Sequence, residues 1–147
     1  MMDLQIREMS IEDAGSIAKL SGQFGYQSSE EETKERILLL KRFPDNCCFV
    51  AVYDNEIIGW IHVMMAVRIE SSPFFEISGF VVDERYRGQG FGKQLVEKVI
   101  SWCKRKGINK LRVRCNVTRI RSHEFYLKQG FKETKVSKIF EVDLKAS

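Results

Sequence analysis

Apolar and polar residues follow two different periods along the chain, and the changes of period divide it into strands and helices. Alternating or continuous apolar runs predict strands at residues 4–9, 47–53, 57–67, 74–82, 110–116, 131–135 and 138–144. Apolar residues that recur every three or four positions predict helices at residues 10–24, 29–43, 91–106 and 119–129. The predicted order is strand, two helices, three strands, helix, strand, helix and two strands.

Turn and cap residues mark the boundaries of several of these elements. Two pairs have the spacing of a helix capping box: Ser10 with Asp13, and Ser29 with Glu32. Asp54-Asn55 is typical of a tight hairpin turn, and Gly59 within the following strand predicts a bulge. The strand at 74–82, the helix at 91–106 and the strand at 110–116 should form a right-handed parallel crossover.

A glycine-rich turn, Arg87-Gly88-Gln89-Gly90-Phe91-Gly92, joins the first strand of this crossover to its helix. Glycine lets the backbone approach a ligand closely because no Cβ stands in the way. The N–H groups and the positive dipole end of the following helix favour a phosphate or pyrophosphate at the same place. An anion site is therefore expected here, although a glycine turn that is purely structural is the alternative.

Two familiar phosphate motifs do not fit this turn. A phosphate loop ends in Gly-Lys-Ser/Thr, but Gly92-Lys93 is followed by Gln94. A dinucleotide fingerprint that starts at Gly88 and Gly90 needs a third glycine at position 93, which is Lys93. The remaining pattern is Arg-x-x-Gly-x-Gly.

Arg87, Gly90 and Gly92 in this spacing resemble the acyl-CoA pyrophosphate loop of the GNAT superfamily of N-acetyltransferases. Three later segments resemble the same family in the same order: Cys115-Asn116-Val117-Thr118-Arg119, Ser122-His123-Glu124-Phe125-Tyr126 and Gly130-Phe131. The resemblance covers nearly the whole chain. It implies one acetyltransferase domain over 1–147 with an α/β (α+β) fold. The sheet would be mixed and mostly antiparallel, with a central parallel strand pair splayed around the cofactor, and about four helices would cover it.

The resemblance also implies which residues hold the cofactor, acetyl-CoA. Phe80, Val81 and Val82 would pair their backbone with the pantetheine arm, while the turn binds the pyrophosphate. The full set of expected cofactor-binding residues is Phe80, Val81, Val82, Arg87, Gly88, Gln89, Gly90, Phe91, Gly92, Asn116, Arg119, Ser122 and Tyr126. Asn116 could instead be a turn former at a strand end. Arg119 departs from the family, in which an asparagine is common at this position, so its role stays open.

Catalysis needs an acid for the departing thiolate and a base for the attacking amine. Tyr126 matches the tyrosine that protonates the CoA sulfur in many family members. Glu76 lies eleven residues before Arg87, the spacing of the catalytic glutamate in histone-type relatives, and strand alternation places it on one face with Ser78 and Phe80. His123 and a water molecule are alternatives for the base, with a structural His123 favoured. His62, among apolar residues, is expected to be a structural side chain with satisfied hydrogen bonds.

Composition excludes some classes of protein but does not indicate which reaction the protein performs. The chain has 147 residues and a net charge of +4, which is too small to argue for nucleic acid, and no run is long enough to cross a membrane. A cytoplasmic location is the default expectation. The four cysteines lack metal or redox spacing, so free thiols and no metal are expected. Basic residues cluster at Arg112, Arg114, Arg119 and Arg121, near the run 104–106. A solvated face is the simpler interpretation of that run, and contacts with a phosphorylated cofactor are the alternative for some of these charges.

The function expected from these features is acetyl transfer from acetyl-CoA to a primary amine, by direct attack in a ternary complex. The resemblance implies that the first two helices, their loop and the later strands wall the acceptor site, where acidic and aromatic residues suit a small cationic amine: Phe24, Tyr26, Glu30, Glu31 and Glu70. Segments 116–119 and 122–126 are similar to those of aminoglycoside 6'-N-acetyltransferase-like members, and a polyamine or a protein or peptide amine stays open. A non-catalytic acyl-CoA-binding regulatory domain is the alternative function. Exposed apolar residues expected at Ile139, Phe140 and Val142 leave room for a homodimer.

Overall fold

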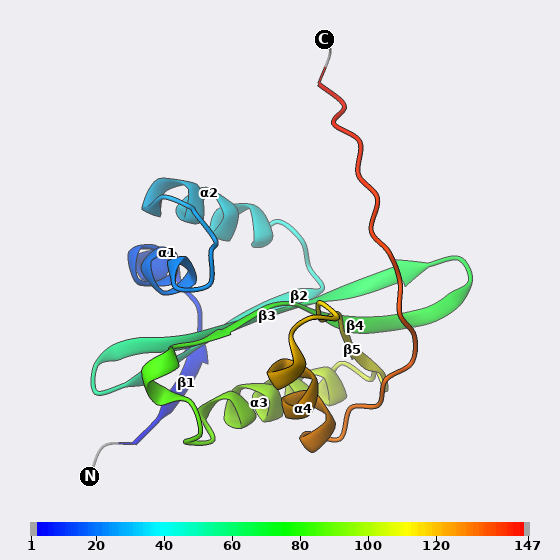
Figure 1. Ribbon diagram of the computed structural model, residues 1–147. Helices are drawn as coiled ribbons and strands as arrows, with labels where there is room; N and C mark the ends of the chain where they lie inside the picture. The colour runs from blue at the N-terminus through cyan, green and yellow to red at the C-terminus, as the bar shows by residue number, and fades with distance from the viewer. Residues whose placement is uncertain (1–2, 146–147) are drawn as a thin grey trace. The chain divides into compact units, whose positions relative to one another are not determined.

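The computed structural model describes residues 3–145, which form two compact units (Figure 1). The first unit runs up to Arg114 and the second begins at Cys115. The first contains, in chain order, β1 (Gln5–Glu8), the 3-10 helix η1 (Ile11–Asp13), α1 (Ala14–Gly22), α2 (Glu30–Leu40), β2 (Asn46–Tyr53), β3 (Glu56–Arg68), β4 (Ser71–Val82), the 3-10 helix η2 (Glu84–Tyr86), α3 (Phe91–Arg105) and β5 (Leu111–Val113). The second contains α4 (Ile120–Lys128).

The five strands form one mixed sheet in the order β1-β2-β3-β4-β5. Neighbouring strands are antiparallel except β4 and β5, whose parallel pairing joins Phe75–Ile77 to Leu111–Val113. α1 and α2 lie over one face of the sheet and α3 over the other (Figure 1). The predicted mixed, mostly antiparallel sheet with one parallel pair and four α-helices is confirmed.

Side chains of β3 alternate between the two helical layers. Trp60 donates a hydrogen bond from Nε1 to Ser21 Oγ of α1 at 3.1 Å, so the even-numbered residues around it face α1 and α2. Ile61 and Val63 therefore face α3, and both are fully buried. On β4, Phe75 packs against Trp102 of α3 with a ring-centroid distance of 4.8 Å. This assignment of faces decides which β4 side chains lie on which side of the sheet.

The β2–β3 hairpin has the predicted turn and bulge. Asp54 and Asn55 have φ angles of 52° and 60°, the left-handed conformation of a tight two-residue turn. Ala51 pairs with Gly59 while Val52 pairs with Ile57, so one extra residue lies in β3 at the position next to Gly59. A Cβ on Gly59 would lie 3.0 Å from the carbonyl oxygen of Val81, which explains why glycine occupies the position.

The N-terminal strand is tied to the first helix by a buried acid. Asp13, only 6% exposed, accepts two hydrogen bonds of 2.9 Å from the Arg7 guanidinium and one of 2.8 Å from the Ser10 N–H. The hydrogen bond from Arg7 is the main reason that the pKa of Asp13 lies below its ordinary value. The ionised carboxylate thus stabilises the fold above the unfolded-state pKa of about 3.9, and this contribution is lost as pH falls through the lower folded-state pKa.

We expect Asp13→Asn to lower the free energy of unfolding at pH 7 by about 1–3 kcal/mol, because charged hydrogen-bond partners would be left unsatisfied. Urea unfolding of both proteins measures this difference. It should shrink when the measurement is repeated at pH values below 4, where wild-type Asp13 also becomes protonated. A difference that stays constant from pH 7 to pH 3 would contradict the role given to the charge.

The end of the chain departs from the sequence prediction. Residues 131–145 contain no strand, so the two strands expected at 131–135 and 138–144 are wrong, and β5 is shorter than the predicted 110–116. The parallel pair consequently lies at one end of the described sheet rather than at its centre. Alternation shows that a segment could cover one face, but a strand also needs a partner edge. Phe140 and Val142 stay 87% and 77% exposed, and a homodimer that buries them stays a prediction.

The cysteines are free thiols, as predicted. Burial raises the pKa of Cys47 and Cys103, and it raises the pKa of Cys48 to about 12. A thiol with a raised pKa is a poor nucleophile at neutral pH. Among residues 3–145, no helix is both long and apolar enough to cross a bilayer.

Candidate acetyl donor site

The turn from Arg87 to Gly90 has the backbone that its glycines suggest. Gly88 and Gly90 both have a φ of 80°, in the left-handed region that other residues rarely adopt. A Cβ built on either glycine would meet no heavy atom within 4 Å. Glycine is therefore required here by the backbone conformation, and the space beside the turn is open to a ligand.

The start of α3 leaves backbone donors available beside this turn. Gly90 is the N-cap residue, no side chain caps the helix, and its first turn contains no acidic residue. The first N–H groups of a helix have no partner within the helix, and the helix dipole adds positive charge at the same end. Open space, uncapped amides and the absence of a carboxylate fit the pyrophosphate that the sequence pattern predicts.

Both ends of the turn are held in place. Before it, the buried Asp83 accepts hydrogen bonds from the backbone N–H and guanidinium of Arg85, which lower the pKa of Asp83. Tyr86 and Phe91 flank the turn, and both pack on Tyr53 of β2, with ring-centroid distances of 5.5 and 5.1 Å. The turn is therefore shaped by the fold rather than by a ligand.

Arg87 carries a cation at the entrance of the turn. Its guanidinium lies 3.7 Å from a carboxylate oxygen of Glu84 and 5.8 Å from the ring centroid of Phe24, which follows α1. Its side chain is 38% exposed. This arginine links the turn to the α1–α2 connection and is available to an anion from solvent.

A bulge in β4 separates Glu76 from the residues expected to line the cofactor. Ile77 pairs with Val63 and Gly79 with His62, so Ser78 is an extra residue in β4. Beyond it, Phe80 pairs with Ile61 on the α3 face, whereas Glu76 pairs with Met64 on the α1–α2 face. The expectation that Glu76 and Phe80 share a face is wrong, because the extra residue reverses the alternation.

The far half of β4 has the geometry that a splayed strand pair requires. Pairing with β5 covers only Phe75–Ile77 among the described residues, while pairing with β3 continues to Val82. The Asp83 N–H donates to Ile58 of β3 at 2.7 Å, so by alternation the N–H of Val82 points away from β3. Val81 pairs with Trp60, so its buried side chain lies on the α1–α2 face of the sheet.

Glu76 lies on the same sheet face as α1 and α2. Its side chain is 20% exposed, and its Oε2 lies 3.4 Å from Arg114 Nε at the end of β5. A partly exposed carboxylate beside the parallel strand pair can reach a molecule on this face. The structure therefore places Glu76 in an ion pair beside the parallel strands, partly accessible to solvent.

His62, which the sequence suggested to be a satisfied structural residue, has an orphaned nitrogen. Its Nε2 is buried and has no hydrogen-bond partner among the described residues. Burial lowers the pKa of His62, so the ring is neutral at pH 7. It lies on the Glu76 face and pairs with Gly79, next to the bulge at Ser78. A polar residue at an inward-facing strand position was the signal for this site in the sequence.

The second unit holds the remaining predicted residues around α4. Asn116 Oδ1 accepts hydrogen bonds from the N–H and hydroxyl of Thr118 at 2.9 and 2.8 Å, the turn-forming role weighed above. His123 Nε2 lies 2.8 Å from the Asn116 carbonyl oxygen, which ties α4 to this turn and agrees with a structural His123. Arg119 precedes α4 without capping it.

Tyr126 and Ser122 lie on α4 itself. Ser122 is in its first turn, where its N–H donates to the Arg119 carbonyl oxygen at 3.1 Å. The Tyr126 ring lies 5.4 Å from that of Phe125 and 5.5 Å from that of Phe131. The Phe131 N–H donates to the Tyr126 carbonyl oxygen at 3.0 Å, so the chain turns back beneath the ring after Gly130. These contacts fix the aromatic ring within its own unit.

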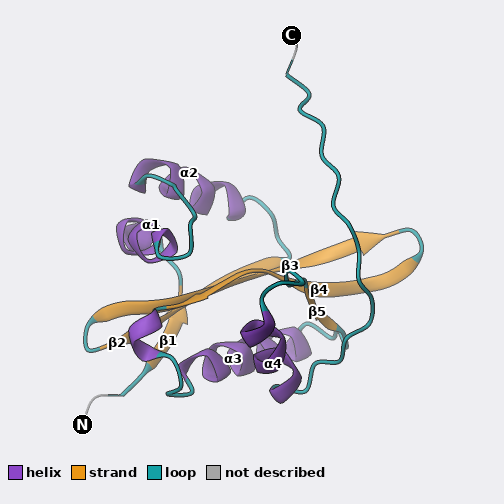
Figure 2. Ribbon diagram, in the orientation of Figure 1, coloured by secondary structure: helices purple, strands orange, loops and turns teal. Residues whose placement is uncertain are grey.

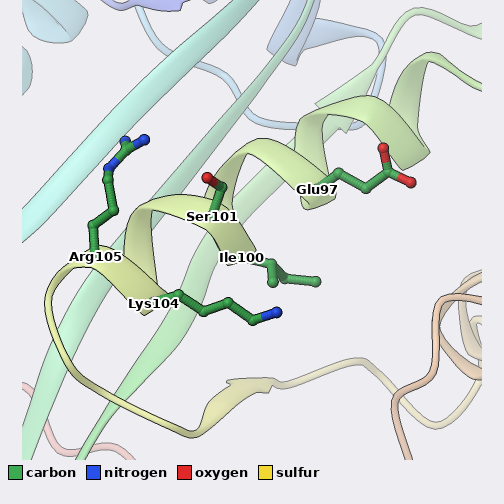
Figure 3. A pocket seen from close by; sticks show the side chains of 5 residues that line it. All are labelled: Glu97, Ile100, Ser101, Lys104 and Arg105. Carbon is green, nitrogen blue, oxygen red and sulfur yellow. The ribbon is translucent and has the colours of Figure 1, made fainter.

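A shallow depression of about 460 Å³ lies elsewhere, along α3 (Figure 3). Five residues of this helix line it: Glu97, Ile100, Ser101, Lys104 and Arg105. It contains none of the predicted site residues. Among residues 3–145, no group of three or more His, Cys, Asp or Glu side chains could hold a metal ion.

Comparison with known proteins identifies the family. Residues 13–131 match the acetyltransferase (GNAT) family. The chain belongs to this family. Members use acetyl-CoA as acetyl donor, which is the ligand whose pyrophosphate the turn before α3 fits.

The similar proteins are acetyltransferases of several amines. Glucosamine 6-phosphate N-acetyltransferase of Arabidopsis thaliana is 30% identical, over 93% of this chain and 97% of its own length. Aminoglycoside N(6')-acetyltransferase type 1 of Stenotrophomonas maltophilia is 25% identical, over 97% and 95%. The chain spans only 33% of the length of the N-acetylaspartate synthetase of Xenopus tropicalis.

Solved structures share the fold. Aminoglycoside N-acetyltransferase AAC(6')-Iy in complex with CoA superposes with a TM-score of 0.85 at 20% identity, covering 97% of this chain and 96% of that one. This likeness shows the GNAT fold, and the family match over residues 13–131 makes the chain an acetyltransferase.

Proposed function

We propose that this protein transfers the acetyl group of acetyl-CoA to a primary amine of a small molecule, by direct attack within a ternary complex. The observation that carries the proposal is the left-handed glycine turn at the uncapped start of α3. The bound coenzyme supplies an acetyl group activated as a thioester. The amides of Gln89, Gly90, Phe91 and Gly92 bind its pyrophosphate, with Arg87 beside them.

In this proposal β4 would orient the coenzyme's arm. The backbone of Phe80, Val81 and Val82 pairs with the pantetheine amides, and the outward Val82 N–H donates to the acetyl carbonyl oxygen as negative charge develops there. Asn116, Arg119 and Ser122 are the further residues proposed to contact the coenzyme. Tyr126 donates its hydroxyl proton to the departing sulfur.

Glu76 acts as the base in this proposal. A primary amine with a pKa of about 10.4 is almost wholly protonated at pH 7, so a proton must leave before attack. Glu76 and Val82 are six residues apart on β4, so the carboxylate would accept that proton through a chain of water molecules.

We expect Glu76→Gln to lower kcat/KM at pH 7 by about 10²–10⁴-fold, the usual contribution of a general base. The loss should become smaller at higher pH, where more of the amine is already unprotonated. Initial rates of thiol release from pH 6.5 to 9.5 measure both effects, with Glu97→Gln on α3 as the matched control. A loss that does not change with pH would assign Glu76 to structure, through its contact with Arg114.

The test of the proposed function is a panel of amines with thiol detection. Acetyl-CoA binding by calorimetry, together with CoA release that depends on an added amine, is the expected result. Aminoglycosides, amino sugars, polyamines and a lysine peptide cover the acceptor classes left open by the sequence. Tight binding of acetyl-CoA without turnover of any amine would favour the alternative, a regulatory domain that binds the coenzyme.

A further inference from the structure

The end of α1 brings an aromatic side chain to the turn that precedes α3. Phe24 follows α1, and a helix cap fixes its backbone. The N–H groups of the next two residues donate to the carbonyl oxygens of Gly22 and Ser21, at 3.2 and 3.3 Å. Gly25 has a φ of 85°, the left-handed conformation that such a cap requires. The position of Phe24 is therefore set by the fold and not by a ligand.

Two further contacts hold this end of α1 near the turn. α1 and η2 lie at the same end of the sheet (Figure 2). Ser21 Oγ accepts a hydrogen bond from Trp60, the β3 residue that pairs with Val81 of β4. Gln23 Oε1 lies 3.5 Å from the N–H of Glu84, where η2 begins. The connection after α1 is thus attached both to the sheet and to the segment that leads into the glycine turn.

Arg87 has two neighbours of different chemical kinds. Its guanidinium lies over the Phe24 ring, 5.8 Å from the ring centroid, and 3.7 Å from a carboxylate oxygen of Glu84. The Glu84 side chain is 62% exposed, and within residues 3–145 it is the one carboxylate that pairs with Arg87. An exposed ion pair of this kind contributes little to stability, because both charges are also well solvated. The guanidinium can therefore exchange Glu84 for another anion while it stays on the ring.

Arg85, two residues earlier, is less available to an anion. Its guanidinium lies 2.9 Å from the buried carboxylate of Asp83 and 3.1 Å from the carboxylate of Glu56. Two carboxylates thus compensate its charge, one of them inside the protein. Of the two arginines in this segment, Arg87 is the one with a single, exposed competitor.

A guanidinium that lies on an aromatic ring keeps its donors for a second partner. The ring attracts the positive charge through its face, whereas the N–H groups lie in the guanidinium plane and can still bind phosphate oxygens. The ring carries no net charge, so it does not repel a pyrophosphate as the Glu84 carboxylate does. Holding a flexible arginine side chain in place before the ligand arrives also lowers the entropy cost of binding.

We infer that Phe24 is a positioning residue of the acetyl donor site. Its ring holds the Arg87 guanidinium at the glycine turn, and the pyrophosphate of the coenzyme replaces Glu84 as the anion beside it. This inference rests on the proposed binding of the pyrophosphate at this turn. The family resemblance gave Phe24 to the wall of the acceptor site, whereas its contact with Arg87 gives it a role on the donor side. The two neighbours of Arg87 should then have opposite effects on coenzyme affinity.

Calorimetric titration of matched variants with acetyl-CoA tests the inference. Phe24→Leu keeps an apolar side chain but removes the ring, and it should weaken binding about two- to fivefold, the range of an exposed cation–π contact. Phe24→Tyr keeps the ring and should bind as the wild type does. Glu84→Gln should strengthen binding by about two- to fivefold, because no ion pair has to be broken first. Phe43→Leu, at a side chain that is 51% exposed after α2, is the control and should change nothing.

A double-mutant cycle distinguishes positioning from a general structural effect. Arg87→Gln should itself weaken binding at least about tenfold, because it removes a charged hydrogen-bond donor. Adding Phe24→Leu to Arg87→Gln should cause no further loss, since the ring then has no cation to hold. A ring that only supported the fold would give the same loss in both backgrounds. Circular dichroism shows whether each variant is folded.

The outcomes separate this inference from the proposed function. The inference is overturned if Phe24→Leu binds as the wild type does, if Phe24→Tyr loses as much as Phe24→Leu, if the losses of Phe24→Leu and Arg87→Gln add, or if Glu84→Gln weakens binding. In each of these cases acetyl-CoA still binds, and the proposed function stands. If Arg87→Gln leaves the affinity unchanged, Phe24 has no cation to position and the inference fails alone. If the wild-type protein does not bind acetyl-CoA, both fail.

Discussion

Tyr126→Phe is expected to lower kcat by about 10²–10⁴-fold while the affinity for acetyl-CoA changes little. The substitution removes one hydroxyl and keeps the ring, whose contacts with Phe125 and Phe131 hold it in place. Protonation of the departing sulfur would be lost, but packing would not. Steady-state thiol release and calorimetry with acetyl-CoA measure the two quantities separately.

A second tyrosine gives the matched control for this result. Tyr53→Phe also removes only a hydroxyl, from a ring that packs beside Tyr86 and Phe91. It should change kcat less than about threefold, because it has no proton to give in the reaction. If Tyr126→Phe keeps full activity while acetyl-CoA binds and an amine is acetylated, Tyr126 is not the acid.

Gly90→Glu is expected to weaken acetyl-CoA binding by at least about 100-fold. The new side chain must adopt a φ of 80°, and it places a carboxylate where the pyrophosphate would bind. Two like charges about 4 Å apart repel by about 4 kcal/mol at an effective dielectric constant of about 20. Calorimetric titration with acetyl-CoA measures the loss.

Gly107→Glu is the control that distinguishes loss of the anion site from the effect of backbone strain. Gly107 follows α3 with a φ of 77° and has the same open surroundings as Gly90. The variant carries an equal charge change and similar backbone strain at the other end of the helix. Its acetyl-CoA affinity should stay within about twofold of wild type. Equal losses in both variants would mean that destabilisation, rather than the anion site, explains the effect.

Local sequence signals were sufficient for most of the fold. Helix caps at Ser29 and the hairpin turn at Asp54-Asn55 depend on residues close in sequence, and the structure has both. The glycine turn was found for the same reason, since its conformation is set by Gly88 and Gly90. Strands at 131–135 and 138–144 failed because a strand depends on a partner edge, which alternation does not specify.

The features of the candidate site that could not be predicted from the sequence depend on contacts between residues far apart in the chain. The bulge at Ser78 depends on the pairing of β4 with β3, and Gly79 beside it was a sequence signal of the same kind as Gly59 that was not used. The contacts of Arg112 with Phe74 and of Arg114 with Glu76 could not be predicted, because they require the parallel pairing of β5 with β4. His62 was visible as a polar residue, but its lack of a partner is a property of the packed sheet.

The extra residue Ser78 makes the two halves of β4 present their side chains to opposite faces of the sheet. Before Ser78 the strand presents Glu76 toward α1 and α2, and after it the strand presents Phe80 toward α3. Deleting that residue would shift the downstream half by one position and exchange inward for outward side chains at every later site. The proposed base and the proposed coenzyme-binding residues therefore belong to one continuous strand. An insertion or deletion between them would misalign the amine with the acetyl group.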